Sequence, residues 1–320
     1  MAFNKNQCFL TLARKYSSSA DKNVAFVGLG NMGGFMAANL VKKGFKVRGY
    51  DPSSEAMSEA AKNGISGAKS VADAVDGADA VVSILPNNKV VLDTYLGKDG
   101  VVEHCRKGAL LIDSSTVDPN VPREIMPVAT EKGKNFIDAP VSGGVMGAQN
   151  ATLAFMAGGR KEDFDRSLPL LQAMGAKQFH CGDIGSGQIA KLTNNMLMGI
   201  TGMATAECMN MGIKAGLDPK ILLDVLNNSS ARSWSTEVYC PVPGLVPTAP
   251  SSRNYENGFK NSLFVKDLEL ASGMALNVRT PIPLGVITTQ FFRMVQARGY
   301  GEKDFSIIYQ LFKEDAHKKQ

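Results

Sequence analysis

Short runs of apolar, often β-branched residues alternate with segments of helical length over the first half of the chain. This alternation predicts repeated strand–helix–strand units and therefore a doubly wound, largely parallel sheet. One helix is expected to begin near Met32 and to end before Gly44, and another to run from Pro119 to about Gly133. The predicted strands are residues 24–27, 46–50, 80–85, 109–112, 136–138 and 153–157.

The strand pattern ends near Gly182, and helical periodicity replaces it. A break at 185–187 introduces a long helix expected from about Gln188 to Ala215. Further helices are expected from Pro219, whose N-cap is Asp218, from about residue 259 and from residue 284, with a Pro/Ser-rich loop at 240–252. We therefore predict an α/β domain over residues 21–184, followed by an all-helical domain over residues 185–320.

Composition and charge exclude several classes of protein. The chain is 44% hydrophobic and 20% charged, which is typical of a folded protein with sizeable cores. Its net charge of +5 is not clustered, so no nucleic-acid partner is expected. The longest uncharged helical stretch, 192–206, is broken by polar residues and is shorter than the ~18 residues of a membrane span. Five widely spaced cysteines without a C-x-x-C pair favour neither a disulfide framework nor a metal site.

The first 20 residues differ in character from the rest. They contain Lys5, Arg14 and Lys15 but no acid, and serines follow the basic pair. This pattern is typical of a mitochondrial transit peptide, with cleavage expected after Tyr16 or a few residues later. The alternative is an ordinary frayed N-terminus. We expect the mature protein to be located in the mitochondrial matrix.

A glycine-rich loop links the first predicted strand to the first predicted helix. In this G-x-G-x-x-G pattern, Gly28 permits a tight turn, Gly30 lets the backbone approach a pyrophosphate, and Gly33 lets helix and strand pack closely. The alternative is a glycine turn that only packs a helix. The expected cofactor-binding residues of the loop are Gly28, Leu29, Gly30, Asn31, Met32 and Gly33.

An acid follows the second predicted strand, about 20 residues after the first glycine. Asp51 is placed to accept hydrogen bonds from the adenosine ribose hydroxyls and would repel a 2′-phosphate. We therefore expect NAD as the cofactor. Arg48, two positions earlier, leaves some use of NADP open.

Lysine is the most informative candidate for proton transfer. Lys191 stands at the entrance of the uncharged stretch, and Asn195 lies one turn further on the same helical face. A partly desolvated lysine has a lowered pKa, which suits it to carry a proton. The alternative is a lysine that only extends its ammonium to solvent. None of the three histidines lies in a glycine-flanked loop, and His180 has no neighbour at metal-ligand spacing. His104 and His180 are therefore interpreted as structural or surface residues.

Two further polar features occur at places where ligands bind. Ser142, Gly143 and Gly144 follow a strand end, and their hydroxyl and unhindered N–H groups suit a carboxylate, although a plain glycine turn is an alternative. Lys266 lies in an apolar stripe at helical spacing, where a lysine is out of place unless it faces a charged group. The stripe reads Phe259, Leu263, Lys266, Leu270 and Met274.

Residues 26–40 resemble the signature of the 3-hydroxyisobutyrate dehydrogenase family, within the β-hydroxyacid dehydrogenases. Residues 187–195 resemble the catalytic segment of that family, in which the lysine matching Lys191 is the general acid/base and the asparagine matching Asn195 orients the substrate. The resemblance further implies that Ser142, Gly143 and Gly144 hold the substrate carboxylate. It implies contacts to NAD from Leu85, Pro86, Thr116 and Lys266. Ala151 and Val90 depart from the pattern, which usually has glycine and asparagine there.

The resemblance implies a Rossmann-like domain with a helical second domain and a function in valine catabolism. The expected reaction is oxidation of 3-hydroxy-2-methylpropanoate (3-hydroxyisobutyrate) to methylmalonate semialdehyde by NAD. A homo-oligomer, dimer or tetramer, is expected. The alternatives are a related enzyme acting on another small 3-hydroxy acid or semialdehyde, and a noncatalytic dinucleotide-binding relative. The latter lack the lysine that Lys191 matches.

Overall fold

A computed structural model describes residues 22–314 of the chain. The predicted transit peptide therefore lies outside the described residues. The chain divides into two compact units, with the boundary between Ala190 and Lys191. The predicted functional boundary after residue 184 stays a prediction.

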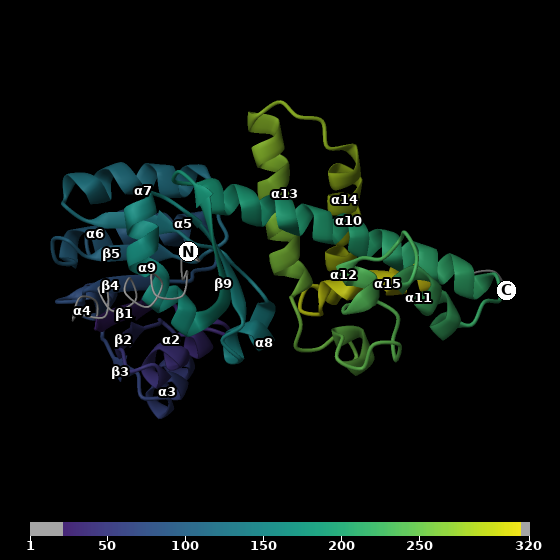
Figure 1. The fold of residues 1–320 in the computed structure, drawn as a ribbon, viewed down its shortest axis with the longest axis horizontal. Coiled ribbons are helices and arrows are strands. Elements are labelled where there is room, and N and C mark those ends of the chain that lie inside the picture. Colours follow the sequence, from purple (N-terminus) through teal and green to yellow (C-terminus); the bar gives the residue numbers. More distant parts are fainter. Residues whose placement is uncertain (1–21, 315–320) are drawn as a thin grey trace, which may run out of the picture. The chain divides into compact units, whose positions relative to one another are not determined.

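The first unit is built on a central sheet whose first six strands are parallel (Figure 1). Their order is β3-β2-β1-β4-β5-β6, so the chain reverses its direction of travel across the sheet between β1 and β4. Open sheets of this kind bind ligands beyond the carboxyl ends of the strands at such a switch point. The strands are β1 (Asn23–Val27), β2 (Lys46–Tyr50), β3 (Ser66–Gly67), β4 (Ala80–Ser83), β5 (Leu110–Asp113) and β6 (Asn135–Asp138).

Three strands extend the sheet beyond β6. β8 (Leu153–Gly158) runs antiparallel to β6 and to β7 (Val141–Ser142), and it pairs in parallel with β9 (Gly175–Gly182). The apolar pattern predicted neither β3 and β7, which have two residues each, nor β9. Most side chains of β9 are exposed or half-buried, so this strand has no apolar run for a pattern to detect.

Helices cover both faces of the sheet because the side chains of each strand alternate between two cores. In β1, Val24 and Phe26 belong to one buried cluster, whereas Ala25 and Val27 belong to the other. Figure 1 shows α7 on one side of the strands and α2 and α3 on the other. The face of Val24 and Phe26 carries α2 (Gly33–Lys42), α3 (Ser54–Lys62), α8 (Gly144–Gln149) and α9 (Lys161–Met174). The face of Ala25 and Val27 carries α4 (Val71–Val75), α5 (Asn88–Leu96), α6 (Val101–His104) and α7 (Asn120–Glu131).

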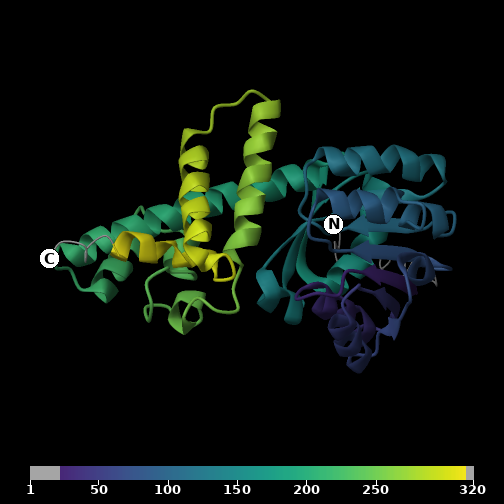
Figure 2. The same ribbon diagram turned by 180° about the vertical axis from the view of Figure 1, so that it is seen from behind.

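The described part of the second unit, residues 191–314, consists of helices and loops and contains no β-strand, as predicted. The long helix α10 (Ser186–Lys214) enters it, and the predicted cap of the next helix is confirmed, because the Asp218 carboxylate accepts the N–H groups of Lys220 and Ile221. Figure 2 shows α13 (Asn261–Asn277) and α14 (Pro283–Val295) side by side. The remaining helices are α11 (Pro219–Asn227), α12 (Trp234–Glu237) and α15 (Tyr309–Glu314), with short helical turns at Pro250–Arg253, Gln296–Tyr300 and Phe305–Ile308.

The buried face of α13 differs from the stripe that the sequence indicated. Phe264, Leu268 and Ala271 are buried, whereas Leu263 is 42% exposed. Phe259 precedes the helix, which begins at Asn261. Both stripes have helical spacing, and only the packing of the second unit selects the one that is buried. None of the helices in residues 22–314 is both long and apolar enough to cross a membrane.

Ala151, between α8 and β8, has a φ of +54°, in the left-handed region that favours glycine. We expect Ala151→Gly to raise the free energy of unfolding by about 0.5–1 kcal/mol, because removing the Cβ relieves the strained backbone. Urea unfolding measures the change. The matched control is Ala61→Gly on the exposed face of α3, which should lower stability by about 1 kcal/mol. Destabilisation by both variants would contradict the strain at Ala151.

Candidate active site

In the glycine loop after β1, backbone atoms pack tightly against Gly28 and Gly33 but not against Gly30. A Cβ on Gly28 would lie 2.3 Å from the carbonyl oxygen of Ile84, and one on Gly33 would lie 1.9 Å from that of Gly28. A Cβ on Gly30 would meet nothing within 4 Å. The packing of the protein therefore requires glycine at 28 and 33, whereas Gly30 leaves open space at the loop surface. Leu29 is buried, Asn31 is exposed and Met32 is half-buried.

The loop can receive the phosphates of a dinucleotide. Met32 occupies the N-cap position of α2, and no side chain caps this helix end by a hydrogen bond. The first N–H groups of a helix carry partial positive charge and suit phosphate oxygens. The open space at Gly30 and this helix end therefore fit a pyrophosphate.

Asp51, at the carboxyl end of β2, holds the loop in place. Its Oδ2 accepts a hydrogen bond of 2.8 Å from the N–H of Leu29, and its Oδ1 accepts one of 2.8 Å from the N–H of Ser53. A carboxylate oxygen accepts two hydrogen bonds, so Asp51 retains capacity for ribose hydroxyls. Arg48, which could otherwise bind the 2′-phosphate of NADP, forms an ion pair with Asp73 of α4. This ion pair partly neutralises its positive charge.

Two more loops reach the same edge of the sheet. The N–H of Leu85, after β4, donates to Ser115 Oγ at 2.8 Å, and Ser115 Oγ donates to Asp113 Oδ1 at 2.6 Å. This hydrogen-bonded chain joins the loop that carries Leu85 and Pro86 to the loop after β5 that carries Thr116. The predicted cofactor residues of the first unit therefore lie at the carboxyl ends of four parallel strands, β1, β2, β4 and β5.

The segment from Ser142 to Gly144 has an unusual backbone. Ser142 pairs with Ala154 in the sheet, and the next two residues both have positive φ, 132° at Gly143 and 60° at Gly144. A Cβ on Gly144 would meet nothing within 4 Å, so its backbone stays accessible. A half-buried hydroxyl beside accessible N–H groups is an arrangement that suits a carboxylate.

A buried polar cluster occupies the second unit. Lys191 and Asn195 lie one turn apart on α10, and their exposed fractions are 7% and 0%. Asn195 Nδ2 donates to Asp267 Oδ2 on α13 at 2.7 Å. Lys266 Nζ lies 3.2 Å from Asp267 Oδ1. Lys266 thus has the charged neighbour that its place in an apolar helix required.

Burial lowers the pKa of Lys191 to about 8, while the negative charge of Asp267 acts in the opposite direction and the positive charge of Lys266 lowers it further. A substantial fraction of the amine is therefore neutral at mildly alkaline pH. A neutral amine accepts a proton, and the ammonium returns it. The cluster can thus exchange a proton with a hydroxyl group.

Asp267 is a member of this buried cluster that the sequence alone did not indicate. It is 2% exposed and contacts two of the predicted site residues. The available signal was its position directly after Lys266, since two adjacent charges inside an apolar helix indicate a polar partner in the core. The structure brings the predicted residues together in two groups, one in each unit.

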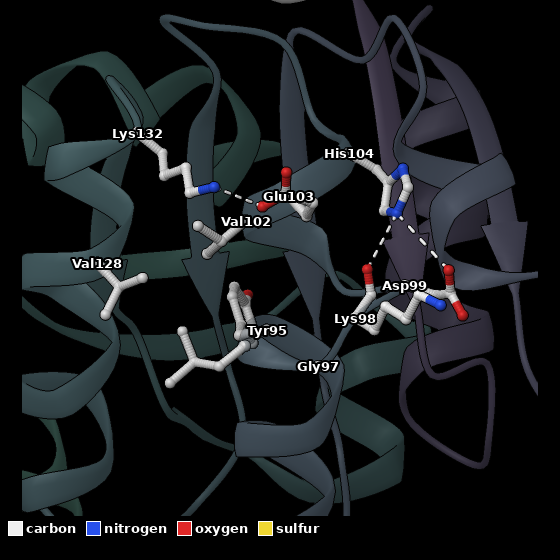
Figure 3. Close-up of a pocket in the computed structure, with 10 residues that line it drawn as sticks. Tyr95, Gly97, Lys98, Asp99, Val102, Glu103, His104, Val128 and Lys132 are labelled. Carbon is white, nitrogen blue, oxygen red and sulfur yellow. Dashed lines mark hydrogen bonds and ion pairs between the residues drawn. The ribbon is translucent and has the colours of Figure 1, made fainter.

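A separate hollow of about 450 Å³ lies among α5, α6 and α7 (Figure 3). None of the predicted site residues lines it. Lys132 and Glu103 pair at 2.6 Å, and His104 lies 3.8 Å from Asp99. Both acidic and basic side chains line the hollow. Among residues 22–314, no group of three or more His, Cys, Asp or Glu side chains could hold a metal ion.

Rossmann-type domains bind dinucleotides through a glycine loop and an acid at the end of the second strand, and a buried amine of lowered pKa suits proton transfer from an alcohol. These features define an NAD-dependent dehydrogenase. Comparison with known proteins supports this class. Residues 23–182 match the NAD-binding domain of 6-phosphogluconate dehydrogenase, and residues 185–312 match the family described as NAD-binding of NADP-dependent 3-hydroxyisobutyrate dehydrogenase.

Relatives that match over most of their length also indicate a dehydrogenase. The chain is 44% identical over 299 residues to mitochondrial 3-hydroxyisobutyrate dehydrogenase of Rattus norvegicus, covering 93% of this chain and 89% of the relative. It is 42% identical to the NAD-dependent L-serine dehydrogenase of Pseudomonas aeruginosa, covering 91% and 98%. A solved structure of Mycobacterium tuberculosis 3-hydroxyisobutyrate dehydrogenase with L-serine is 39% identical, with a TM-score of 0.87 and coverage of 92% and 99%. The chain belongs to the 3-hydroxyisobutyrate dehydrogenase family.

Proposed function

We propose that this protein oxidises 3-hydroxyisobutyrate to methylmalonate semialdehyde with NAD, a step of valine catabolism. The observation that carries the proposal is the buried amine of Lys191, whose lowered pKa fits a group that takes a proton from a hydroxyl. The names of its relatives support the choice of substrate.

Each predicted residue has a role in this reaction. Ser142, Gly143, Gly144 and Asn195 bind the substrate carboxylate, and Lys191 removes the proton of the hydroxyl group. NAD, when bound, accepts the hydride from the carbinol carbon. Gly30 and the start of α2 hold its pyrophosphate, and Asp51 holds the ribose. The other residues proposed to contact NAD are Gly28, Leu29, Asn31, Met32, Gly33, Leu85, Pro86, Thr116 and Lys266.

A second candidate substrate is L-serine, because a relative and a solved structure carry it in their names. Both substrates are small 3-hydroxy acids, and both would use the same lysine. A noncatalytic dinucleotide-binding role is not favoured, because such a protein would gain nothing from a desolvated lysine beside Asn195 and Asp267.

Initial rates with 3-hydroxyisobutyrate, L-serine and glycerate, each with NAD and NADP, test the proposal. We expect kcat/KM to be highest for 3-hydroxyisobutyrate with NAD, by about 10-fold over L-serine, because a site built for a methyl group leaves an ammonium poorly solvated. Asp51 should disfavour NADP by a comparable factor. A higher kcat/KM with L-serine would contradict the proposed substrate, and a higher kcat/KM with NADP would contradict the proposed cofactor.

We also propose a homo-oligomer, dimer or tetramer, formed through the second unit. Large apolar side chains on α13 and α14 are exposed, by 79% at Leu276, 60% at Leu284 and 49% at Ile287. Such side chains are usually covered in an assembly. Light scattering should give a mass of at least two chains, and the introduction of a charge by Ile287→Lys should lower it. A monomer at micromolar concentration would contradict this.

Location in the mitochondrial matrix is proposed from the basic, acid-free first 20 residues and from relatives named as mitochondrial. Import into isolated mitochondria should shorten the chain near Tyr16. An unprocessed chain that stays outside would refute the proposal.

A further inference from the structure

A buried acid at the carboxyl end of β6 has no role in the reaction as proposed. Asp138 is 0% exposed, and both of its carboxylate oxygens are engaged. Oδ1 accepts a hydrogen bond of 2.7 Å from the N–H of Gly185, and Oδ2 accepts one of 2.9 Å from the N–H of Gln188. These N–H groups flank the start of α10 at Ser186. One carboxylate therefore binds the first turn of this helix at two points.

The backbone around Asp138 is arranged for this close approach. A Cβ on Gly158 would lie 2.6 Å from Asp138 Oδ1, and one on Gly187 would lie 2.7 Å from Oδ2 and 2.2 Å from the carbonyl oxygen of Met156. Any side chain at these two positions would push the helix away from the acid. The glycines at 158 and 187 thus allow α10 to begin directly against the sheet.

Gln188 attaches the same turn of α10 to the loop that follows β5. Its side chain is 0% exposed, its Oε1 accepts the N–H of Val117 at 3.0 Å, and its Nε2 donates to the carbonyl oxygen of Ser115 at 2.9 Å. These bonds flank Thr116, a proposed cofactor contact. Four buried hydrogen bonds therefore join the start of α10 to the end of β6 and to the loop after β5.

We infer that Asp138 and Gln188 are positioning residues for Lys191. They hold the place and the rotation of the first turn of α10, and Lys191 follows Gln188 by three residues on that helix. The direction in which the amine projects depends on both. A displacement of about 1 Å can cost about 100-fold in rate, so four fixed bonds near the amine matter for turnover. The inference rests on the proposed role of Lys191.

Ordinary helix capping does not need such an arrangement. The exposed carboxylate of Asp218 caps α11 by accepting two N–H groups, without burial. Burial raises the pKa of Asp138 to about 7, although the hydrogen bonds from Gly185 and Gln188 act against this rise. A buried acid is a costly cap, which favours a role in placing the helix accurately.

Asp138→Asn tests the inference. The asparagine keeps one acceptor but turns an NH2 group toward a backbone N–H, so one of the two bonds is lost. We expect kcat to fall by about 10- to 100-fold, while the Kd for NAD changes by less than about 2-fold. The matched control Asp218→Asn makes the same change at an exposed cap and should leave kcat within about 2-fold.

A double-mutant cycle separates positioning from a merely structural role. If Asp138 acts through Lys191, Asp138→Asn should lower the residual rate of Lys191→Ala by less than about 3-fold. Full additivity of the two losses would overturn the inference, and so would a kcat for Asp138→Asn close to that of the parent.

Should Asp138→Asn not fold, Gln188→Met takes its place with the same expected results. Failure of both to fold would assign these residues to folding instead. Retained turnover in Lys191→Ala alone would instead refute the proposed function.

Discussion

Lys191→Ala should lower kcat by about 10²- to 10⁴-fold, the range that a positioned acid/base contributes. The amine is buried beside Asn195 and Asp267, so water cannot readily replace it as the proton acceptor. NAD binding should persist, because the glycine loop and Asp51 lie in the other unit. Initial rates of NADH formation measure the first effect, and titration of the cofactor measures the second.

Lys214→Ala is the matched control for this variant. Lys214 lies at the far end of the same helix and is exposed, so its removal changes a lysine of α10 without touching the buried cluster. Its kcat should equal that of the parent enzyme. If Lys191→Ala kept most of its turnover, the proton would be taken by another group and the proposed mechanism would be wrong.

The second large effect is on pH dependence. Oxidation needs the neutral amine of Lys191, and burial lowers the pKa of this amine to about 8. Below that pH the amine is protonated and cannot accept the hydroxyl proton. We therefore expect kcat/KM for oxidation to fall by about 10-fold for each pH unit below about 8. Reduction of the semialdehyde needs the ammonium, so its rate should fall above that pH instead.

Asp267→Asn gives this profile an internal check. The negative charge of Asp267 raises the pKa of Lys191, so its removal should move the fall in kcat/KM to lower pH. The amide oxygen of the new residue can still accept the hydrogen bond of Asn195. A profile that is flat between about pH 6 and 9 would show that Lys191 is not the titrating base.

Much of the fold could be read from local patterns. The buried parallel strands are apolar runs, and the capping pair Asp218-Pro219 has the chemistry that the start of α11 requires. The glycine loop was recognisable because its residues are consecutive. Patterns failed where the structure is short or exposed, as in β3, β7 and β9, because such strands bury too little to leave a signal.

The site was predictable to the extent that its residues occur in short motifs. Lys191 and Asn195 share one helix face, and the segment 142–144 is continuous. Asp267 and Asp138 were not assigned, since their partners lie 72 and 50 residues away in the chain. No spacing rule links residues that far apart, and only the packing of helices and strands brings them together.

The sequence by itself determined the class of fold, the dinucleotide loop with its acid and the lysine available for proton transfer. Each of these depends on the chemistry of neighbouring residues, so one stretch of chain is enough to recognise it. Only the tertiary structure decided how the functional groups are held. It showed which face of α13 is buried, that Asp267 binds Asn195, and that Asp138 and Gln188 anchor α10. Burial and long-range hydrogen bonds arise from packing, and packing exists only when distant segments have folded together.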